Sequence, residues 1–234
     1  MAPPLYKPMI LAYFVIKKPM VQSAKAQAVY SAVCQEDVKL GDLRKMAKEI
    51  KRDHEMALEL WQTGDYMARQ LAILIMDRKA LTPAVVDQLS DDISQHPYVE
   101  MNQLADWFMA NQLTKGKPTI ALMESWQHSN RAIQRRIYWY YQGRLRWAGK
   151  TPPNNAPTLL AGIEAGIATE CPEVQWAMNF TAAQIGINEP QYRAQCIALG
   201  ERLGLYKDEP VSKGCTPAYL PAWINQEVAK LQKV

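Results

Sequence analysis

A hydrophobic period close to that of an α-helix constrains this chain most, and it continues from about residue 21 onward. In segments 43–53 and 66–76 the apolar residues recur every three or four positions, which places them on one helical face. Helix-start signals, such as Gly64–Asp65 and Thr82–Pro83, interrupt this pattern at regular intervals. Alternating β-branched residues, which indicate strands, are nearly absent. The sequence therefore predicts an all-α fold of about ten helices joined by short turns.

Two segments of the helical region resemble each other. Both 57–69 (ALELWQTGDYMAR) and 121–135 (ALMESWQHSNRAIQR) contain a Trp-Gln pair, then Asp or Asn, then Arg. Trp61 and Trp126 are 65 positions apart, which is about two units of 33 residues, a length typical of solenoids of helix pairs. The concave face of a solenoid is its usual binding surface. The alternative is a non-repetitive helical bundle in which the Trp-Gln pairs are coincidental.

The length of 234 residues suits one large domain, and we expect residues 1–234 to form a single repeat domain. Residues 1–20 contain the apolar run MILAYFVI, which is too short to span a bilayer and is interpreted as a packing segment. Residues 205–234 are rich in Pro and Gly and are expected to form a tail that ends in a short helix and folds back on the last repeat. With no targeting signal evident, we expect a cytoplasmic protein without membrane contact. We also expect a monomer.

The positive charge of the chain is concentrated in its middle. The net charge is only +4, but residues 107–163 hold eight Lys and Arg against one acid, Glu124. Such asymmetry is typical of a surface that binds a polyanion, although a solvated basic face is equally consistent with it. The preceding segment 77–106 holds six acids and two bases, and it offers partners that neutralise the basic run.

Metal and cofactor sites are not indicated. The four cysteines are irregularly spaced, and neither a CxxC motif nor a close metal-ligand spacing occurs with the three histidines. No glycine-rich phosphate loop or nucleophile elbow is present. We therefore expect reduced thiols, no metal and no cofactor.

Segment 126–147 (WQHSNRAIQRRIYWYYQGRLRW) combines five arginines with six Trp or Tyr residues. If a helix begins near residue 130, Arg131, Arg135 and Tyr138 share one face, whereas Tyr140 falls on another that suits the core. A face of Arg and Tyr can contact phosphates and stack on sugars or bases. In the alternative interpretation the rings are core and the guanidinium groups pair with acids of a neighbouring repeat.

Two further segments carry candidate residues. In 96–108 a helix starting near Pro97 places Tyr98 and Asn102 one turn apart beside an apolar stripe, where a groove-facing pair would lie. An Asn in a helix is more often an ordinary surface or inter-helix hydrogen-bonding residue. In 173–186 Phe180 follows an aromatic residue by one turn, a pattern more typical of core than of a stacking platform.

Segment 41–77 (GDLRKMAKEIKRDHEMALELWQTGDYMARQLAILIMD) is similar to the amino-terminal repeats of the DNA alkylation repair family, the AlkD-like DNA glycosylases. The resemblance continues more loosely through WQHSNRAIQRR and VQWAMNFTAAQIG and covers roughly residues 40–205. It implies a right-handed superhelical solenoid of HEAT-like or armadillo-type antiparallel helix pairs with a basic concave groove for duplex DNA. It also implies a role in base excision repair, by release of N3- and N7-alkylated purines.

The same resemblance implies a site of two aromatics, a carboxylate and an arginine. Carried onto this chain, these positions fall at Tyr98 and Phe180, at Asn102, and at Arg135. Asn102 is neutral where the family pattern has a carboxylate that stabilises a developing cationic sugar. A shift of two residues would place His96 and Glu100 at the first two positions instead.

Three functions stay open from the sequence: a DNA glycosylase, a non-catalytic relative that binds nucleic acid structures, and a helical scaffold for a protein partner. Asn102 favours the second over the first, and the basic window favours either over the third. The residues expected to bind DNA are Arg131, Arg135, Tyr138, Lys115 and Lys117.

Overall fold

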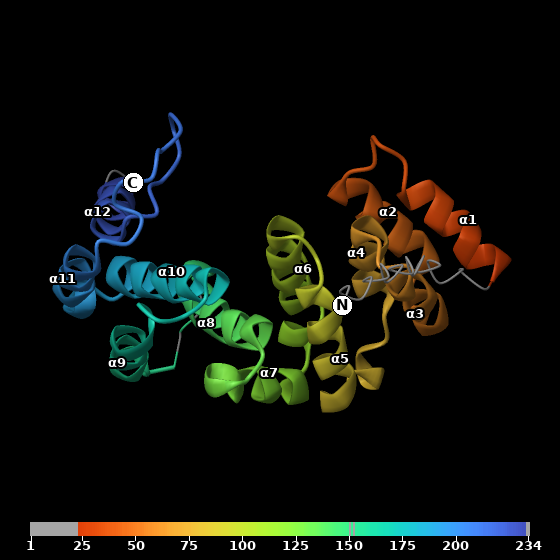
Figure 1. Ribbon diagram of the computed structural model, residues 1–234, viewed down its shortest axis with the longest axis horizontal. Helices are drawn as coiled ribbons and strands as arrows, with labels where there is room; N and C mark the ends of the chain where they lie inside the picture. The colour runs from red at the N-terminus through yellow and green to blue at the C-terminus, as the bar shows by residue number, and fades with distance from the viewer. Residues whose placement is uncertain (1–22, 150, 152, 233–234) are drawn as a thin grey trace, which may run out of the picture.

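The computed structural model describes residues 23–149, 151 and 153–232, and within them the chain forms twelve α-helices and no strand. The helices follow one another along a curved row that leads from α1 to α12 (Figure 1). On the inner side of the curve lie α2, α4 and α6, while α3, α5 and α7 form the outer layer (Figure 1).

The first six helices are α1 (Ala24–Val33), α2 (Leu40–Ile50), α3 (His54–Gln62), α4 (Tyr66–Ile75), α5 (Pro83–Ser94) and α6 (Tyr98–Asn111). The other six are α7 (Lys117–Glu124), α8 (Ala132–Trp147), α9 (Ala156–Gly166), α10 (Pro172–Asn188), α11 (Arg193–Leu203) and α12 (Leu220–Leu231). Short 3₁₀ turns η1 (Arg78–Ala80), η2 (Leu113–Lys115), η3 (Trp126–His128) and η4 (Pro190–Tyr192) join some of them.

The helices are arranged as successive pairs, α3 with α4, α5 with α6, and α7 with α8. The second helices of the first three pairs begin at Tyr66, Tyr98 and Ala132, so the repeat length is 32 and then 34 residues. This confirms the period predicted from the similar Trp-Gln segments. Trp61 in α3 and Trp126 in η3 occupy comparable buried positions, each 4% exposed, two pairs apart.

The helix starts predicted from the sequence are confirmed at α4 and α5. The Asp65 carboxylate accepts hydrogen bonds from the backbone N–H groups of Met67 and Ala68, which caps α4. Gly64 precedes it with a φ of 70°, a conformation that favours glycine. The Thr82 hydroxyl caps α5, whose first turn contains Pro83.

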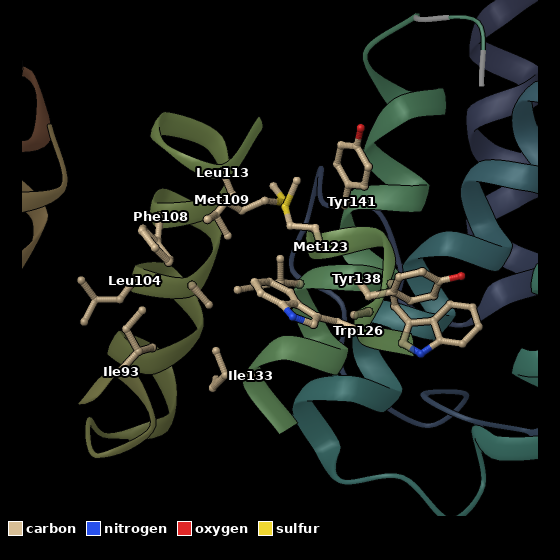
Figure 2. Packing of buried hydrophobic residues seen from close by; sticks show 14 of the residues in the cluster. Ile93, Leu104, Phe108, Met109, Leu113, Met123, Trp126, Ile133, Tyr138 and Tyr141 are labelled. Carbon is tan, nitrogen blue, oxygen red and sulfur yellow. The ribbon is translucent and has the colours of Figure 1, made fainter. Parts of the chain in front are cut away.

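A continuous hydrophobic core runs along the row between the inner and outer helices. Figure 2 shows part of it: Leu104 and Phe108 of α6 lie near Ile93 of α5, and Met123 of α7 lies near Trp126. Because each pair buries its apolar stripe against the next pair, the core has no single centre and the solenoid is held together by neighbour contacts.

At the C-terminal end, α12 packs against α10 and α11 after an irregular segment, 204–219. The expected N-terminal packing segment 1–20 lies outside the described residues. In the part of the chain that the structure describes, no helix is both long and apolar enough to cross a membrane.

Candidate functional site

A hollow of about 560 Å³ opens between the inner helices α2, α4, α6 and α8. Its volume falls within the range of ordinary ligand sites. We call it the concave hollow, because α2, α4 and α6 border the inner side of the curve (Figure 1). Its lining residues are Leu40, Arg44, Tyr66, Gln70, Gln103, Asp106, Trp107, Ala110, Asn111, Lys115 and Arg144.

Trp107 of α6 is a fixed, half-buried aromatic surface in this hollow. Its indole N–H donates to the carbonyl oxygen of Gln70 at 3.0 Å, which sets the orientation of the ring. The guanidinium carbon of Arg44 lies 4.6 Å from the ring centroid, a cation–π contact. Tyr66 donates to the side chain of Gln103 nearby, so the polar groups of α4 and α6 are connected across the hollow.

Asp106 is the one carboxylate among the residues that line the concave hollow. Both of its oxygens accept hydrogen bonds from Nη2 of Arg136 at 2.9 Å, and Arg136 also donates to the carbonyl oxygen of Glu173 at 3.2 Å. Burial raises the pKa of Asp106 to about 6, although the arginine opposes this effect. At neutral pH the carboxyl group is therefore mostly an anion, held in place by one cation.

The face of α8 that points toward this carboxylate carries Arg136, Tyr140 and Arg144 at intervals of four residues. The guanidinium of Arg136 lies 5.6 Å from the ring centroid of Tyr140 and 5.2 Å from that of Trp176 in α10. Burial raises the pKa of Tyr140, which keeps its hydroxyl protonated. An anion–cation pair thus lies beside two aromatic rings.

Three cations at the hollow are not neutralised by ion pairs. Within the described residues no carboxylate oxygen lies within 4.0 Å of a side-chain nitrogen of Arg44, Lys115 or Arg144. Arg44 and Lys115 are exposed, and Arg144 is half-buried. Unpaired cations at a concave surface favour binding of an anionic polymer.

Arg131 and Arg135, predicted to face a groove, are instead held by acids of other helix pairs. Arg131 contacts Asp87 at 3.2 Å and Asp91 at 2.7 Å, both in α5. Arg135 donates to both oxygens of Glu170, at 2.8 and 2.9 Å. These two side chains therefore fit the alternative interpretation, in which the guanidinium groups pair with acids of a neighbouring repeat. Segment 77–106 supplies part of the neutralising charge.

Tyr138 was expected on the same exposed face, and that orientation is wrong. The residue is 7% exposed and belongs to the core, where its ring packs edge-on against Trp139 with ring centroids 5.0 Å apart. Its hydroxyl donates to Oε1 of Gln127 at 3.2 Å. The helix is rotated so that Tyr140, expected in the core, is the half-buried ring beside Arg136. Four consecutive aromatics allow either rotation. In this one α8 packs against α10, where Tyr140 contacts Trp176 and Phe180.

The residues placed by the family pattern are not gathered in the concave hollow. Tyr98 is 50% exposed at the first position of α6, and Asn102 is half-buried one turn later, with no hydrogen-bond partner for Oδ1 among the described residues. Phe180 is 7% exposed and stacks on Trp176 with ring centroids 5.6 Å apart. Lys117 is exposed at the start of α7.

The shifted pair, His96 and Glu100, forms a separate contact. Nδ1 of His96 donates to the Glu100 carboxylate at 2.9 Å, because Arg69 donates to Nε2 of the same ring at 2.8 Å. Arg69 also donates to the carbonyl oxygens of Trp61 and Asp92. These bonds tie α4 to the end of α5.

Sequence reasoning missed Arg44, Asp106, Trp107 and Arg144 as site residues. The available signal was the second stripe of α6, in which Gln103, Asp106–Trp107 and Ala110–Asn111 recur with helical spacing opposite the apolar stripe. No group of three or more His, Cys, Asp or Glu side chains in the described part of the chain could hold a metal ion.

Comparison with known proteins places this geometry in a family. The sequence profile of the family described as "DNA alkylation repair enzyme" matches residues 26–201. A solved structure described as "a new family of proteins related to the HEAT-like repeat DNA glycosylases with affinity for branched DNA structures" superposes with a TM-score of 0.62. The two sequences are 20% identical, and the match covers 90% of each chain, so it shows a shared HEAT-like helical solenoid. No curated protein sequence matches the chain.

Proposed function

Because the chain belongs to the DNA alkylation repair enzyme family, we propose that it binds duplex DNA in the concave hollow and releases alkylated purines there. The observation that carries this proposal is the placement of three unpaired cations, Arg44, Lys115 and Arg144, around the fixed indole of Trp107. Cations on phosphates position a duplex, and an aromatic surface contacts sugar and base. We further propose that the protein binds DNA as a monomer.

Asp106 supports the chemical step of this proposal. Hydrolysis of an N-glycosidic bond develops positive charge on the sugar, and a carboxylate beside that charge lowers the barrier. The family pattern puts Asn102 at the carboxylate position, but Asp106 is one turn further along α6, lines the hollow and is held by Arg136. The bond between C1′ and the base nitrogen breaks, its electron pair leaves with the cationic alkylated purine as a neutral base, and water adds to C1′ and releases a proton to solvent. The DNA backbone stays intact with one abasic sugar.

The test compares two substitutions on α6 by release of methylated purines from methylated duplex DNA. We expect Asp106→Asn to lower the release rate by about 100-fold or more. We expect Asn102→Asp to leave it unchanged. If Asn102→Asp raises the rate and Asp106→Asn has no effect, position 102 rather than Asp106 is the catalytic position, with Tyr98 and Phe180 as its aromatic neighbours. Circular dichroism of each variant excludes a folding defect.

A second candidate function is DNA binding without base release. It is favoured by the neutral Asn102 and by the structural neighbour, whose description names affinity for branched DNA. Under this proposal the wild-type protein binds a duplex or a branched junction but releases no methylated base in the same assay. Asp106→Asn would then change stability and leave no activity to lose.

A further inference from the structure

A second hollow of about 560 Å³ lies at the C-terminal end of the row, between the end of α8, α10 and α12. We call it the C-terminal pocket. Its walls include Trp147 from α8, Phe180, Gln184 and Asn188 from α10, and Trp223 and Lys230 from α12. None of the residues that line the concave hollow lines this pocket.

Aromatic side chains form two sides of the C-terminal pocket. Trp147 is 59% exposed, an unusual state for so large an apolar side chain at the end of a packed helix. Phe180 is buried, and its ring centroid lies 6.0 Å from that of Trp223. Flat rings that border an open space of this size suit a flat, aromatic ligand.

Two amides give the pocket a specific hydrogen-bonding edge. The Gln184 side chain is 5% exposed, and its Oε1 accepts from Nδ2 of Asn188 at 3.3 Å. Within the described residues Nε2 of Gln184 and Oδ1 of Asn188 have no hydrogen-bond partner. One donor and one acceptor are therefore available from adjacent turns of α10. Nucleobases present the same combination on their edges once they are unpaired.

The charges at the mouth of the pocket connect it to the concave hollow. Arg144 lines the concave hollow, and its guanidinium carbon lies 5.1 Å from the ring centroid of Trp147. Lys230 is exposed on the opposite side, where it pairs with Glu227 at 2.6 Å. A strand that leaves a duplex in the concave hollow would pass a cation before its next base reaches Trp147.

We propose that the C-terminal pocket binds one unpaired nucleobase of a single-stranded segment that adjoins the duplex. The base stacks on Trp147, and Gln184 and Asn188 meet its edge. This inference rests on the proposed binding of duplex DNA, and it narrows the DNA to a duplex with an unpaired extension. It needs no bond to form or break.

The test measures binding of three DNA ligands by fluorescence anisotropy: a blunt duplex, the same duplex with a short single-stranded overhang, and one with an abasic overhang. We expect wild-type protein to bind the base-bearing overhang about tenfold more tightly than the other two. Trp147→Ala should remove this preference. Because the guanidinium of Arg144, which lines the concave hollow, also contacts the Trp147 ring, blunt-duplex binding is measured for the same variant, and the preference is the ratio of the two affinities. Trp147→Phe, the matched control, should retain most of the preference.

The outcomes separate the two proposals. Equal affinity for base-bearing and abasic overhangs, with blunt-duplex binding intact, would overturn the C-terminal pocket and leave the proposed function standing. A preference that survives in Trp147→Ala would also overturn it. Failure to bind any of the three ligands would overturn both. As an independent measurement, 2-aminopurine in the overhang should lose fluorescence on binding wild-type protein, and not on binding Trp147→Ala.

Discussion

Replacement of Gly143 by Ala should destabilise the protein, because α10 lies too close to α8 at this residue for an added Cβ. An added Cβ would lie 2.6 Å from Cδ1 and 2.7 Å from Cε1 of Phe180, and 3.1 Å from the backbone Cα of Thr181. The Phe180 ring has little room to move. Its centroid lies 4.9 Å from that of Tyr140, and Trp176 and Trp223 pack on it as well.

Two opposing terms set the size of this effect. Crowding a packed contact costs about 1–3 kcal/mol, or more where backbone must move. Alanine in a helix interior is favoured over glycine by about 1 kcal/mol. Since the added methyl group of Gly143→Ala meets backbone as well as a confined ring, we expect the crowding to prevail and the free energy of unfolding to fall by about 1–2 kcal/mol.

Urea denaturation followed by circular dichroism measures this change as a lower midpoint at constant slope. The matched control is Gly41→Ala, also in a helix, where an added Cβ meets no heavy atom within 4 Å. That variant should be as stable as wild type or up to about 1 kcal/mol more stable. If Gly143→Ala equals or exceeds the stability of wild type, the close crossing of α8 and α10 is refuted.

Three further predictions concern buried charges. Arg136→Met leaves the Asp106 carboxylate without its cation. We expect a loss of about 2 kcal/mol in urea unfolding, below the range for fully buried pairs because the Asp106 side chain is 32% exposed; unchanged stability would contradict the pairing. Burial raises the pKa of the Asp106 carboxyl group from 3.8 to about 6 in the folded state. As the pH falls, the folded protein therefore binds a proton at Asp106 before the unfolded chain does. Lowering the pH from 6 to 4 should therefore stabilise wild type relative to Asp106→Asn, and parallel pH profiles would refute this shift. Glu189→Gln leaves the Arg146 side chain, 0% exposed, without its carboxylate at 2.5 Å; thermal melting should show a loss of about 3 kcal/mol, and a loss near zero would contradict a buried pair.

The sequence predicted the repeat architecture well because its signals are local. Helix starts at Asp65 and Thr82 depend on hydrogen bonds that span three residues, and the similar Trp-Gln segments report the spacing of helix pairs directly. The family resemblance agrees with the same architecture, and the family profile match extends over residues 26–201.

The candidate site was harder to predict, because it depends on the rotation of each helix and on distant partners. The period of α8 places Tyr138 and Tyr140 on different faces but does not say which face the next pair covers. Arg131 and Asp91 are 40 positions apart in the sequence, and Arg135 and Glu170 are 35 apart. Asp106 lies one residue before the basic window 107–163 and within the acidic segment 77–106, so the sequence indicates neutralising charge at this position and not a site residue.

The most direct test of the central claim is the salt dependence of duplex binding. The logarithm of the association constant should fall linearly with the logarithm of salt concentration, with a slope of about −3 if Arg44, Lys115 and Arg144 each displace a counterion. Arg144→Ala should make the slope less negative by about 1. Arg131→Ala should leave the slope unchanged, because it removes a cation that is already paired with Asp87 and Asp91. Binding that is insensitive to salt, or a slope that changes with Arg131 and not with Arg144, would contradict DNA binding in the concave hollow.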